Sequence, residues 1–258
     1  MIAVRNLQIR MGGRTLLDDL SFTIGAGEFV AILGRNGVGK TTLLRTLCGL
    51  HRNFSGTIAL NGRSLSEYSQ SERARAIAYV ASDETMLEML SVRDVVSNGR
   101  YAHHGWFNWR ETPADAAAVE TALEAVDMQA FSYRMLTTLF GGERQRCWLA
   151  LALAQEPQIM LLDEPTSHLD IHVAHDILRL LRSQRAGGRT VVCVLHELNE
   201  ALEFADRILI LGDGRLLSMR EARDFKDAGD LERAYGLAME SIRLSDGSVR
   251  VFPRPSAG

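Results

Sequence analysis

The chain has few cysteines, no long apolar run and no tract of like charge. Its 258 residues include three widely spaced cysteines, an odd number that argues against a disulfide framework and for reduced, buried thiols. No segment reaches the roughly 18 consecutive apolar residues that a membrane span needs, and residues 1–10 lack the apolar centre of a signal peptide. Because the net charge is −3 and the charges are mixed along the chain, we expect no nucleic-acid partner. Because no segment is long and apolar enough to span a membrane, any membrane role requires another protein.

A glycine-rich segment is the most specific pattern that the sequence does contain. It fits G-x-x-x-x-G-K-[ST], follows an apolar, strand-like run at residues 28–33 and precedes a predicted helix at residues 42–50. Glycines let the backbone turn its N–H groups toward a polyphosphate, Lys40 can reach the β- and γ-phosphates, and the Thr41 hydroxyl can ligate Mg²⁺. The pattern predicts a nucleotide site formed by Gly34, Arg35, Asn36, Gly37, Val38, Gly39, Lys40, Thr41 and Thr42.

Polar residues follow two further apolar runs that read as buried strands. Asp163 and Glu164 come directly after residues 159–162, and His196 follows residues 190–195. The carboxyl ends of the strands form the ligand-binding edge of an open α/β sheet, so these side chains should lie beside the phosphate loop. We expect Asp163 to hold Mg²⁺ through water, Glu164 to act as general base toward the attacking water, and His196 to contact the γ-phosphate.

A second glycine-led helix start occurs at residues 139–145 and reads LFGGERQ. Its free N–H groups and helix dipole favour an anion, yet no lysine follows the glycines as one does in a phosphate loop. Together with residues 34–42, 159–164, 167–170 and His196, this segment resembles the motifs of the ATP-binding subunit of an ABC transporter. The order and spacing of the motifs match that family along nearly the whole chain.

The resemblance implies an α/β fold: a RecA-like P-loop NTPase core with an antiparallel β subdomain and a helical subdomain that carries the signature. It also implies a homodimer in which each ATP, with Mg²⁺, lies between the phosphate loop of one copy and the signature helix of the other. A single copy would then hold half of each site. The resemblance assigns the signature role to Phe140, Gly141, Gly142 and Glu143 and the D-loop role to Ser167 and Asp170.

Residues 99–110 and 195–211 resemble a narrower group, the ATPases of bacterial type II importers for iron–siderophores, vitamin B12 or haem. This resemblance implies a membrane permease and, indirectly, a periplasmic substrate-binding protein as partners. It also implies a peripheral location on the cytoplasmic face of the inner membrane. An iron chelate is the favoured cargo, because the haem branch continues the signature differently. The alternatives are a soluble ABC-type ATPase acting on ribosomes or DNA, and a nucleotide-binding module with weak turnover.

The sequence departs from the family pattern at positions that bear on catalysis. Phe140 replaces a serine whose hydroxyl contacts the γ-phosphate across the dimer, which predicts slower or weaker ATP-driven closure. Ser82 stands where the family has a glutamine that reaches Mg²⁺, and Asp83 is a candidate substitute on the metal side. Met11 replaces an aromatic residue that stacks on adenine, and its thioether can still pack on a purine ring. The intact phosphate loop and carboxylates argue against an inactive ATPase.

The chain reads as one ABC ATP-binding domain over residues 1–258. We assign residues 1–85 and 156–215 to the nucleotide-binding core, residues 86–155 to the helical subdomain, and residues 216–258 to a C-terminal helix and hairpin. This tail is too short to form a separate regulatory domain.

Local signals predict elements on both sides of the core motifs. Residues 1–24 and 55–62 read as strands of an antiparallel sheet. Thr112, Pro113 and Asp115 mark a helix start, with the threonine as N-cap and the proline in the first turn. Candidates for the permease contact, or alternatively for local packing, are Trp106, Phe107 and Trp109.

Overall fold

A computed structural model of the chain describes residues 1–82, 89–104, 110–225 and 229–254. Its central element is a six-stranded sheet in which five neighbouring strands are parallel and β10 is antiparallel at one edge. In sheet order the strands are β10 Arg215–Glu221, β9 Arg207–Gly212, β3 Phe29–Leu33, β8 Thr190–Val194, β7 Ile159–Asp163 and β6 Ile77–Val80. Strands β3, β7 and β8 are buried at every position, as expected for parallel strands that are covered on both faces.

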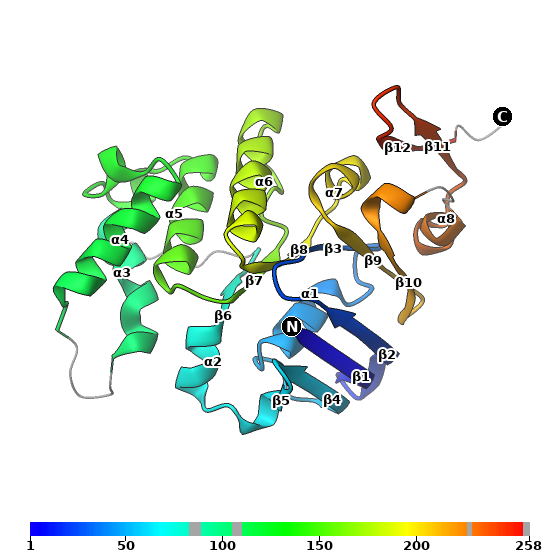
Figure 1. Cartoon of the computed structure of the whole chain (residues 1–258), viewed down its shortest axis with the longest axis horizontal. Coiled ribbons are helices and arrows are strands. Elements are labelled where there is room, and N and C mark those ends of the chain that lie inside the picture. Colours follow the sequence, from blue (N-terminus) through cyan, green and yellow to red (C-terminus); the bar gives the residue numbers. More distant parts are fainter. Residues whose placement is uncertain (83–88, 105–109, 226–228, 255–258) are drawn as a thin grey trace.

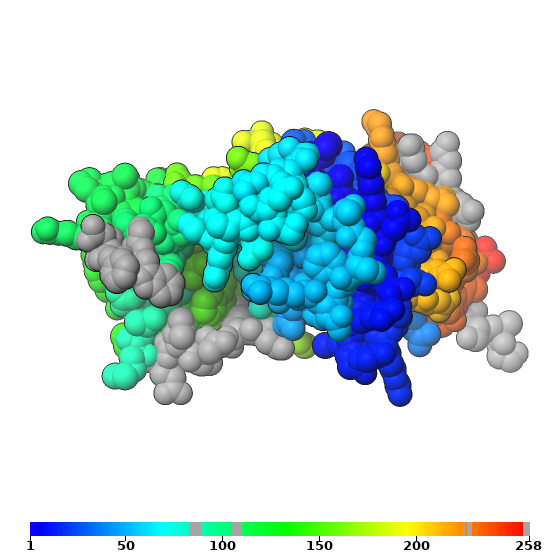
Figure 2. Space-filling view, turned by 90° about the horizontal axis from the view of Figure 1, so that it is seen from below, coloured from blue at the N-terminus to red at the C-terminus, as the bar shows by residue number. Residues whose placement is uncertain are grey.

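A four-stranded antiparallel sheet forms a second layer, in the order β2-β1-β4-β5. Its strands are β1 Ile2–Met11, β2 Arg14–Ile24, β4 Phe54–Leu60 and β5 Arg63–Ser64. The turn between β1 and β2 is made by Gly12 and Gly13, which both have positive φ, as a tight hairpin requires. The strands predicted for residues 1–24 and 55–62 are confirmed. In Figure 2 the blue-to-cyan residues, which include this sheet, lie between the green helical part and the orange-to-red C-terminal part.

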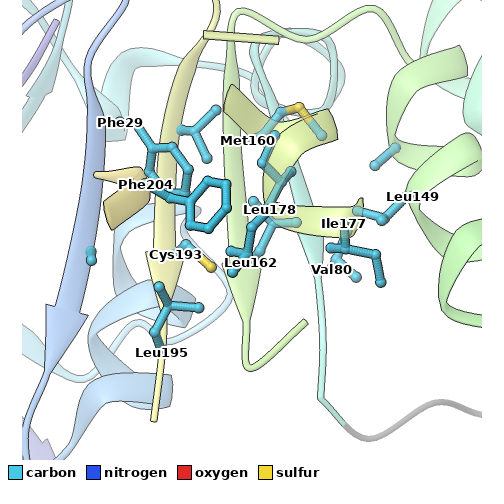
Figure 3. Packing of buried hydrophobic residues seen from close by; sticks show 14 of the residues in the cluster. Phe29, Val80, Leu149, Met160, Leu162, Ile177, Leu178, Cys193, Leu195 and Phe204 are labelled. Carbon is cyan, nitrogen blue, oxygen red and sulfur yellow. The ribbon is translucent and has the colours of Figure 1, made fainter. Parts of the chain in front are cut away.

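The central sheet separates two apolar cores, because neighbouring residues of a strand point to opposite faces. On one face, Val30 and Ile32 of β3 pack with helix α1 (Lys40–Leu47) and the antiparallel sheet. On the other face, Phe29 of β3 belongs to the core formed with α6 (Ile171–Ala186) and α7 (Leu198–Phe204). Figure 3 shows this second core, with Phe29 and Phe204 beside Cys193. Both cores immobilise the strands whose carboxyl ends carry the polar motifs.

The helical part of the molecule packs next to β6 (Figure 1). Its main helices are α3 (Val92–Ser97), α4 (Pro113–Ala125) and α5 (Gly141–Ala154). The predicted start of α4 is confirmed, since Asp115 N donates to Thr112 Oγ1 at 3.2 Å and Thr112 N donates to Asp115 Oδ2 at 2.9 Å. Shorter elements are α2 Gln70–Ala76, η1 Leu65–Glu67, η2 Asn98–His103, η3 Gln129–Phe131 and η4 Leu136–Thr138.

The C-terminal part lies at the opposite end of the molecule, beside β9 and β10 (Figure 1). It comprises η5 Ala222–Asp224, α8 Gly229–Tyr235, β11 Met239–Arg243 and β12 Val249–Pro253. Strands β11 and β12 pair as the predicted antiparallel hairpin, and Asp246 in its turn accepts a hydrogen bond from Ser248 N at 2.9 Å. Among the helices of the described ranges, none has the length and apolar character to cross a membrane. The chain therefore has the α/β fold that its motifs predict, whereas the proposed subdomain boundaries remain predictions.

Candidate nucleotide-binding site

The phosphate loop begins where β3 ends and leads directly into α1. Gly34, Gly37 and Gly39 all have positive φ. A Cβ on Gly34 would lie 2.5 Å from the carbonyl oxygen of Leu211, and a Cβ on Gly39 would lie 3.0 Å from Cγ of Leu17. Glycine is therefore required at these two positions both by the backbone conformation and by the close approach of neighbouring atoms.

Lys40 is the first residue of α1 and is only 5% exposed. Its Nζ donates to the carbonyl oxygens of Gly34 at 2.8 Å and of Arg35 at 3.1 Å. Burial lowers the pKa of Lys40, and the carboxylates of Glu164 and Asp163 oppose this shift. The loop thus holds a partly desolvated cation against its own carbonyls, at a place where phosphate oxygens would be stronger partners.

Asp163, the last residue of β7, is fully buried beside the start of α1. Thr41 Oγ1 donates to Asp163 Oδ1 at 3.0 Å, and Tyr79 Oη donates to Asp163 Oδ2 at 3.4 Å. Arg45 Nε in turn donates to Tyr79 Oη at 3.3 Å. Burial raises the pKa of Asp163, and the hydrogen bond from Thr41 opposes the rise. A hydroxyl and a carboxylate oxygen are thereby brought together, and both are ligands that Mg²⁺ accepts.

Glu164 and His196 meet where β7 and β8 end. His196 Nε2 lies 2.7 Å from Glu164 Oε2, and Ser167 Oγ donates to the same oxygen at 3.3 Å. Glu164 has φ of 54°, and its N–H donates to Val194 O at 3.2 Å, which fixes the backbone of the carboxylate. A cleft runs between this pair and the phosphate loop, lined by Asn36, Glu164, Ser167, His196, Asn199 and Glu200.

The second glycine-led helix start, at α5, is exposed. Phe140 is the N-cap residue and is 78% exposed, and Gly141 is exposed as well. Glu143 Oε2 accepts from Phe140 N at 2.9 Å, which is half of a capping box, since phenylalanine has no oxygen to accept the reciprocal bond. A Cβ on Gly142 would lie 2.9 Å from Val173 of α6. The atoms closest to the two glycines thus belong to Leu169, just before α6, and to Val173 of α6, and not to the phosphate loop.

Other predicted residues lie apart from the cluster around Lys40. Met11 is 56% exposed at the end of β1 and pairs with Arg14 across the hairpin. Ser82 is exposed directly after β6, and Asp170 is exposed as the N-cap residue of α6. Asp83 and the aromatic residues predicted to contact the permease, Trp106, Phe107 and Trp109, lie outside the described residues.

The sequence reasoning missed two tyrosines that contact the site. Tyr79 bonds to Asp163, as described above, and Tyr235 Oη accepts from Gly34 N at 3.3 Å. Tyr79 could have been found, because it lies near the carboxyl end of β6 and the same strand-end rule applies to it. Tyr235 belongs to α8, far along the chain, and no local pattern marks it.

This fold and this arrangement of residues define a P-loop ATPase. The profile of the ABC transporter family matches residues 17–167, and the chain belongs to that family. Over 233 residues it is 39% identical to the ferric enterobactin transport ATP-binding protein FepC of Escherichia coli K12, covering 90% of this chain and 85% of the relative. It is 37% identical to the hemin import ATP-binding protein HmuV of Rhodococcus jostii, covering 96% of this chain and 84% of that protein.

Solved structures agree with this assignment. An inward-facing structure described as a metal-chelate type ABC transporter superimposes with a TM-score of 0.84 at 28% identity, covering 99% of this chain and 98% of that one. The dimeric bacterial ABC transporter cassette MJ0796 gives a TM-score of 0.76 at 27% identity, covering 87% of this chain and all of the other. The predicted family is confirmed, and the chain is an ATP-binding subunit of the kind that hydrolyses ATP.

Proposed function

We propose that the chain energises a bacterial importer whose cargo is an iron chelate of the siderophore type. The observation that supports ATP hydrolysis is the grouping of Lys40, Thr41, Asp163, Glu164 and His196 at one edge of the central sheet. Import of an iron chelate is supported by the relatives, because FepC is named for ferric enterobactin and HmuV for hemin. The siderophore is preferred over haem because a further relative, the probable siderophore transport ATP-binding protein YusV of Bacillus subtilis, is 37% identical over 83% of this chain.

We infer that Thr41 and Asp163 hold the Mg²⁺ that accompanies ATP. Their oxygens lie 3.0 Å apart, and this hydroxyl–carboxylate pair suits a small, hard cation that prefers oxygen ligands. When bound, the ion would neutralise negative charge that develops on the phosphates. Ser82 and Asp83 remain candidates for a further ligand on the metal side.

Hydrolysis requires an aligned water and a group that takes its proton. Lys40 would exchange the loop carbonyls for phosphate oxygens, while the N–H groups of residues 34–42 enclose the phosphates. Glu164 is the proposed general base, and His196, 2.7 Å away, would orient its carboxylate toward the water. As the water oxygen bonds to the γ-phosphorus, its proton passes to Glu164 and the bond to the bridging oxygen of ADP breaks.

A second copy of the chain would complete each ATP site. The start of α5 offers N–H groups and the positive end of a helix dipole, which suit the γ-phosphate of an ATP bound to the partner. In this arrangement Phe140, Gly141, Gly142 and Glu143 face the partner's nucleotide, and Ser167 and Asp170 lie in the D-loop between the copies. Met11 would pack on the adenine. The dimeric MJ0796 cassette supports such a pair.

The remaining partners follow from the importer assignment. A membrane permease would bind the ATPase dimer at the cytoplasmic face of the inner membrane, and a periplasmic binding protein would deliver the cargo to that permease. The ATPase would therefore act on cargo uptake without contacting the cargo.

Transport in reconstituted vesicles tests the proposal. The chain is co-purified with its permease, placed in proteoliposomes with internal MgATP, and supplied with the binding protein and ⁵⁵Fe-siderophore, haem or cobalamin. We expect uptake of the iron chelate, and we expect Glu164→Gln to lower ATP hydrolysis and uptake by at least about 100-fold, the range of a lost general base. Glu124→Gln, on the exposed side of α4, is the matched control and should retain wild-type rates.

Each alternative has its own outcome in this experiment. Preferred uptake of haem or cobalamin would overturn the cargo and leave the ATPase intact. Failure to bind a permease, together with stimulation by ribosomes or DNA, would favour a soluble ABC ATPase. ATP binding without turnover in the presence of permease would favour a nucleotide-binding module, which Phe140 and Ser82 motivate.

A further inference from the structure

The C-terminal helix α8 ends against the phosphate loop. Gly34 N, the first N–H of the loop, donates to Tyr235 Oη at 3.3 Å. The tyrosine is half-buried, and its ring packs against the apolar core. The next residue also approaches the loop, since a Cβ on Gly236 would lie 3.7 Å from a guanidinium nitrogen of Arg35.

Two glycines allow the loop, β9 and α8 to pack this closely. A Cβ on Gly34 would lie 2.5 Å from Leu211 O, at the end of β9. A Cβ on Gly212 would lie 3.3 Å from the Cα of Ala234 in α8. Because packed protein interiors do not deform continuously, a displacement of α8 would also displace the first residue of the loop.

The hairpin that follows α8 is attached to α7, the helix directly after His196. The Asn199 side chain accepts from Val251 N at 2.9 Å and donates to Val251 O at 3.2 Å. Arg250 forms an ion pair with Glu203 at 2.7 Å. The C-terminal part therefore makes two contacts with the site region: α8 contacts the phosphate loop, and β12 contacts α7, the helix that follows His196.

We propose that Tyr235 is a positioning residue of the nucleotide site, whose hydroxyl holds the start of the phosphate loop while Lys40 moves from the loop carbonyls to the phosphates. Gly34 is held on both sides, its N–H by Tyr235 and its carbonyl by Lys40 at 2.8 Å. Only the carbonyl contact must break when Lys40 turns to a nucleotide, so the Tyr235 contact keeps the loop in its binding conformation. The inference rests on the proposed function in that the loop binds ATP.

The tyrosine hydroxyl is suited to this role at neutral pH. Burial raises the pKa of Tyr235, and the hydrogen bond from Gly34 N opposes the rise. The net shift keeps the phenol protonated through the working range, so it introduces no negative charge beside bound phosphates.

Replacing Tyr235 by phenylalanine tests the inference, because the ring remains and only the hydroxyl is lost. We expect Tyr235→Phe to raise the Kd for MgATP about 3- to 10-fold, the effect of one hydrogen bond, with kcat at saturating ATP unchanged. The control is Tyr68→Phe, which removes a hydroxyl that donates to Leu60 O at 3.0 Å. Both variants should lose similar thermal stability, and only Tyr235→Phe should lose ATP affinity.

Hydrogen exchange of the nucleotide-free protein gives a second readout. The peptide that contains Gly34 should exchange faster in Tyr235→Phe than in the wild type or in Tyr68→Phe. Wild-type affinity and wild-type exchange in Tyr235→Phe would overturn the inference. Lys40→Ala separates the two proposals: if Lys40→Ala binds MgATP as tightly as the wild type, the loop is not the ATP site and the proposed function itself fails.

Discussion

The two glycine-led helix starts of this chain have opposite surroundings. Helix α1 begins inside the molecule, where Lys40 is buried and Thr41 donates to the buried carboxylate of Asp163 at 3.0 Å. Helix α5 begins at the surface, where Phe140 is 78% exposed and Glu143 caps the first turn. Both starts offer N–H groups and a positive dipole end to an anion.

This difference indicates that the two starts would supply different halves of a nucleotide site. The α1 start has the buried Lys40, the Thr41 and Asp163 oxygens that we propose as Mg²⁺ ligands, and the nearby Glu164 that we propose as the general base. The α5 start supplies N–H groups and a dipole, so an anion bound there needs its other contacts from another molecule. A two-fold pair would satisfy both starts at once if each copy contributed α1 to one site and α5 to the other, as we propose.

Mixing two inactive variants is the test with the largest expected effect. Lys40→Ala damages the α1 start, and Gly141→Asp places a carboxylate at the α5 start, where the nearest atom to a new Cβ is Leu169 Cδ2 at 3.8 Å. We expect each variant alone to lose about 100-fold or more of the ATPase rate. A 1:1 mixture should recover roughly a quarter of the wild-type rate, since half of the dimers are mixed and each of these keeps one intact site. The rate is measured on co-expressed, permease-bound protein.

Co-expression of each variant with itself is the control for this recovery. No recovery in the mixture would mean that α1 and α5 of one copy serve the same site, or that one damaged site stops the other. A tandem fusion of the two variants separates these outcomes, because it fixes the pairing and reports nucleotide binding at each site.

The site was predictable where chemistry follows the end of a strand. Asp163, Glu164 and His196 were expected at one edge because each follows a buried apolar run, and the structure brings His196 to within 2.7 Å of Glu164. The start of α4 was predictable for a local reason, since Thr112 and Asp115 bond to each other within one turn. Such patterns depend on neighbours in the sequence.

The contacts of Tyr79 and Tyr235 could not be predicted from such local sequence patterns. Tyr79 and Asp163 are separated by 84 positions, and Gly34 and Tyr235 by 201. Their meeting depends on the order of strands in the sheet and on how α8 packs against β9, which hydrophobic periodicity does not determine. The sequence also did not predict that the α5 start is exposed, because a pair of glycines can begin a buried helix or an exposed one.

The Phe140→Ser substitution changes the α5 start alone, and we expect it to alter both stability and the ATPase rate by an intermediate amount. A serine would complete the capping box with Glu143, which should add about 1 kcal/mol to the free energy of unfolding. Its hydroxyl would also offer a donor to the partner's γ-phosphate, so we expect the ATPase rate to rise about 3- to 10-fold, the effect of one hydrogen bond. Steady-state hydrolysis and thermal unfolding measure the two effects separately.

Tyr133→Ser is the matched control, because Tyr133 is also an exposed aromatic residue of the helical part, at 84% exposure. It should leave the ATPase rate unchanged. An unaltered rate in Phe140→Ser would show that the phenylalanine does not slow turnover. A rise in Tyr133→Ser as well would show that removing any exposed aromatic residue has this effect.

The smallest expected effect is on stability, and it comes from replacing the buried carboxyl of Asp163 beside the start of α1. Burial raises the pKa of Asp163 above the ordinary value of 3.8, so ionising this carboxyl favours the unfolded chain. The protonated carboxyl contributes to the free energy of unfolding. This contribution is fully present below about pH 3.8 and is lost as the pH rises through the raised pKa of the folded protein. An asparagine at position 163 stays neutral at every pH and so avoids this loss. In the absence of nucleotide and Mg²⁺, the Asp163→Asn variant should therefore have a free energy of unfolding about 1 kcal/mol higher than the wild type at pH 7.

Thermal unfolding between pH 4 and pH 8 checks this prediction, because the advantage of Asp163→Asn should shrink toward the acid end, where both side chains are neutral. Adding MgATP should reverse the order at pH 7, since ligand binding stabilises the wild type and the variant lacks the proposed metal ligand. Glu143→Gln at the exposed α5 start serves as the comparison and should show neither pH-dependent gain nor reversal. An advantage of Asp163→Asn that is independent of pH would mean that packing rather than the buried charge distinguishes the two helix starts.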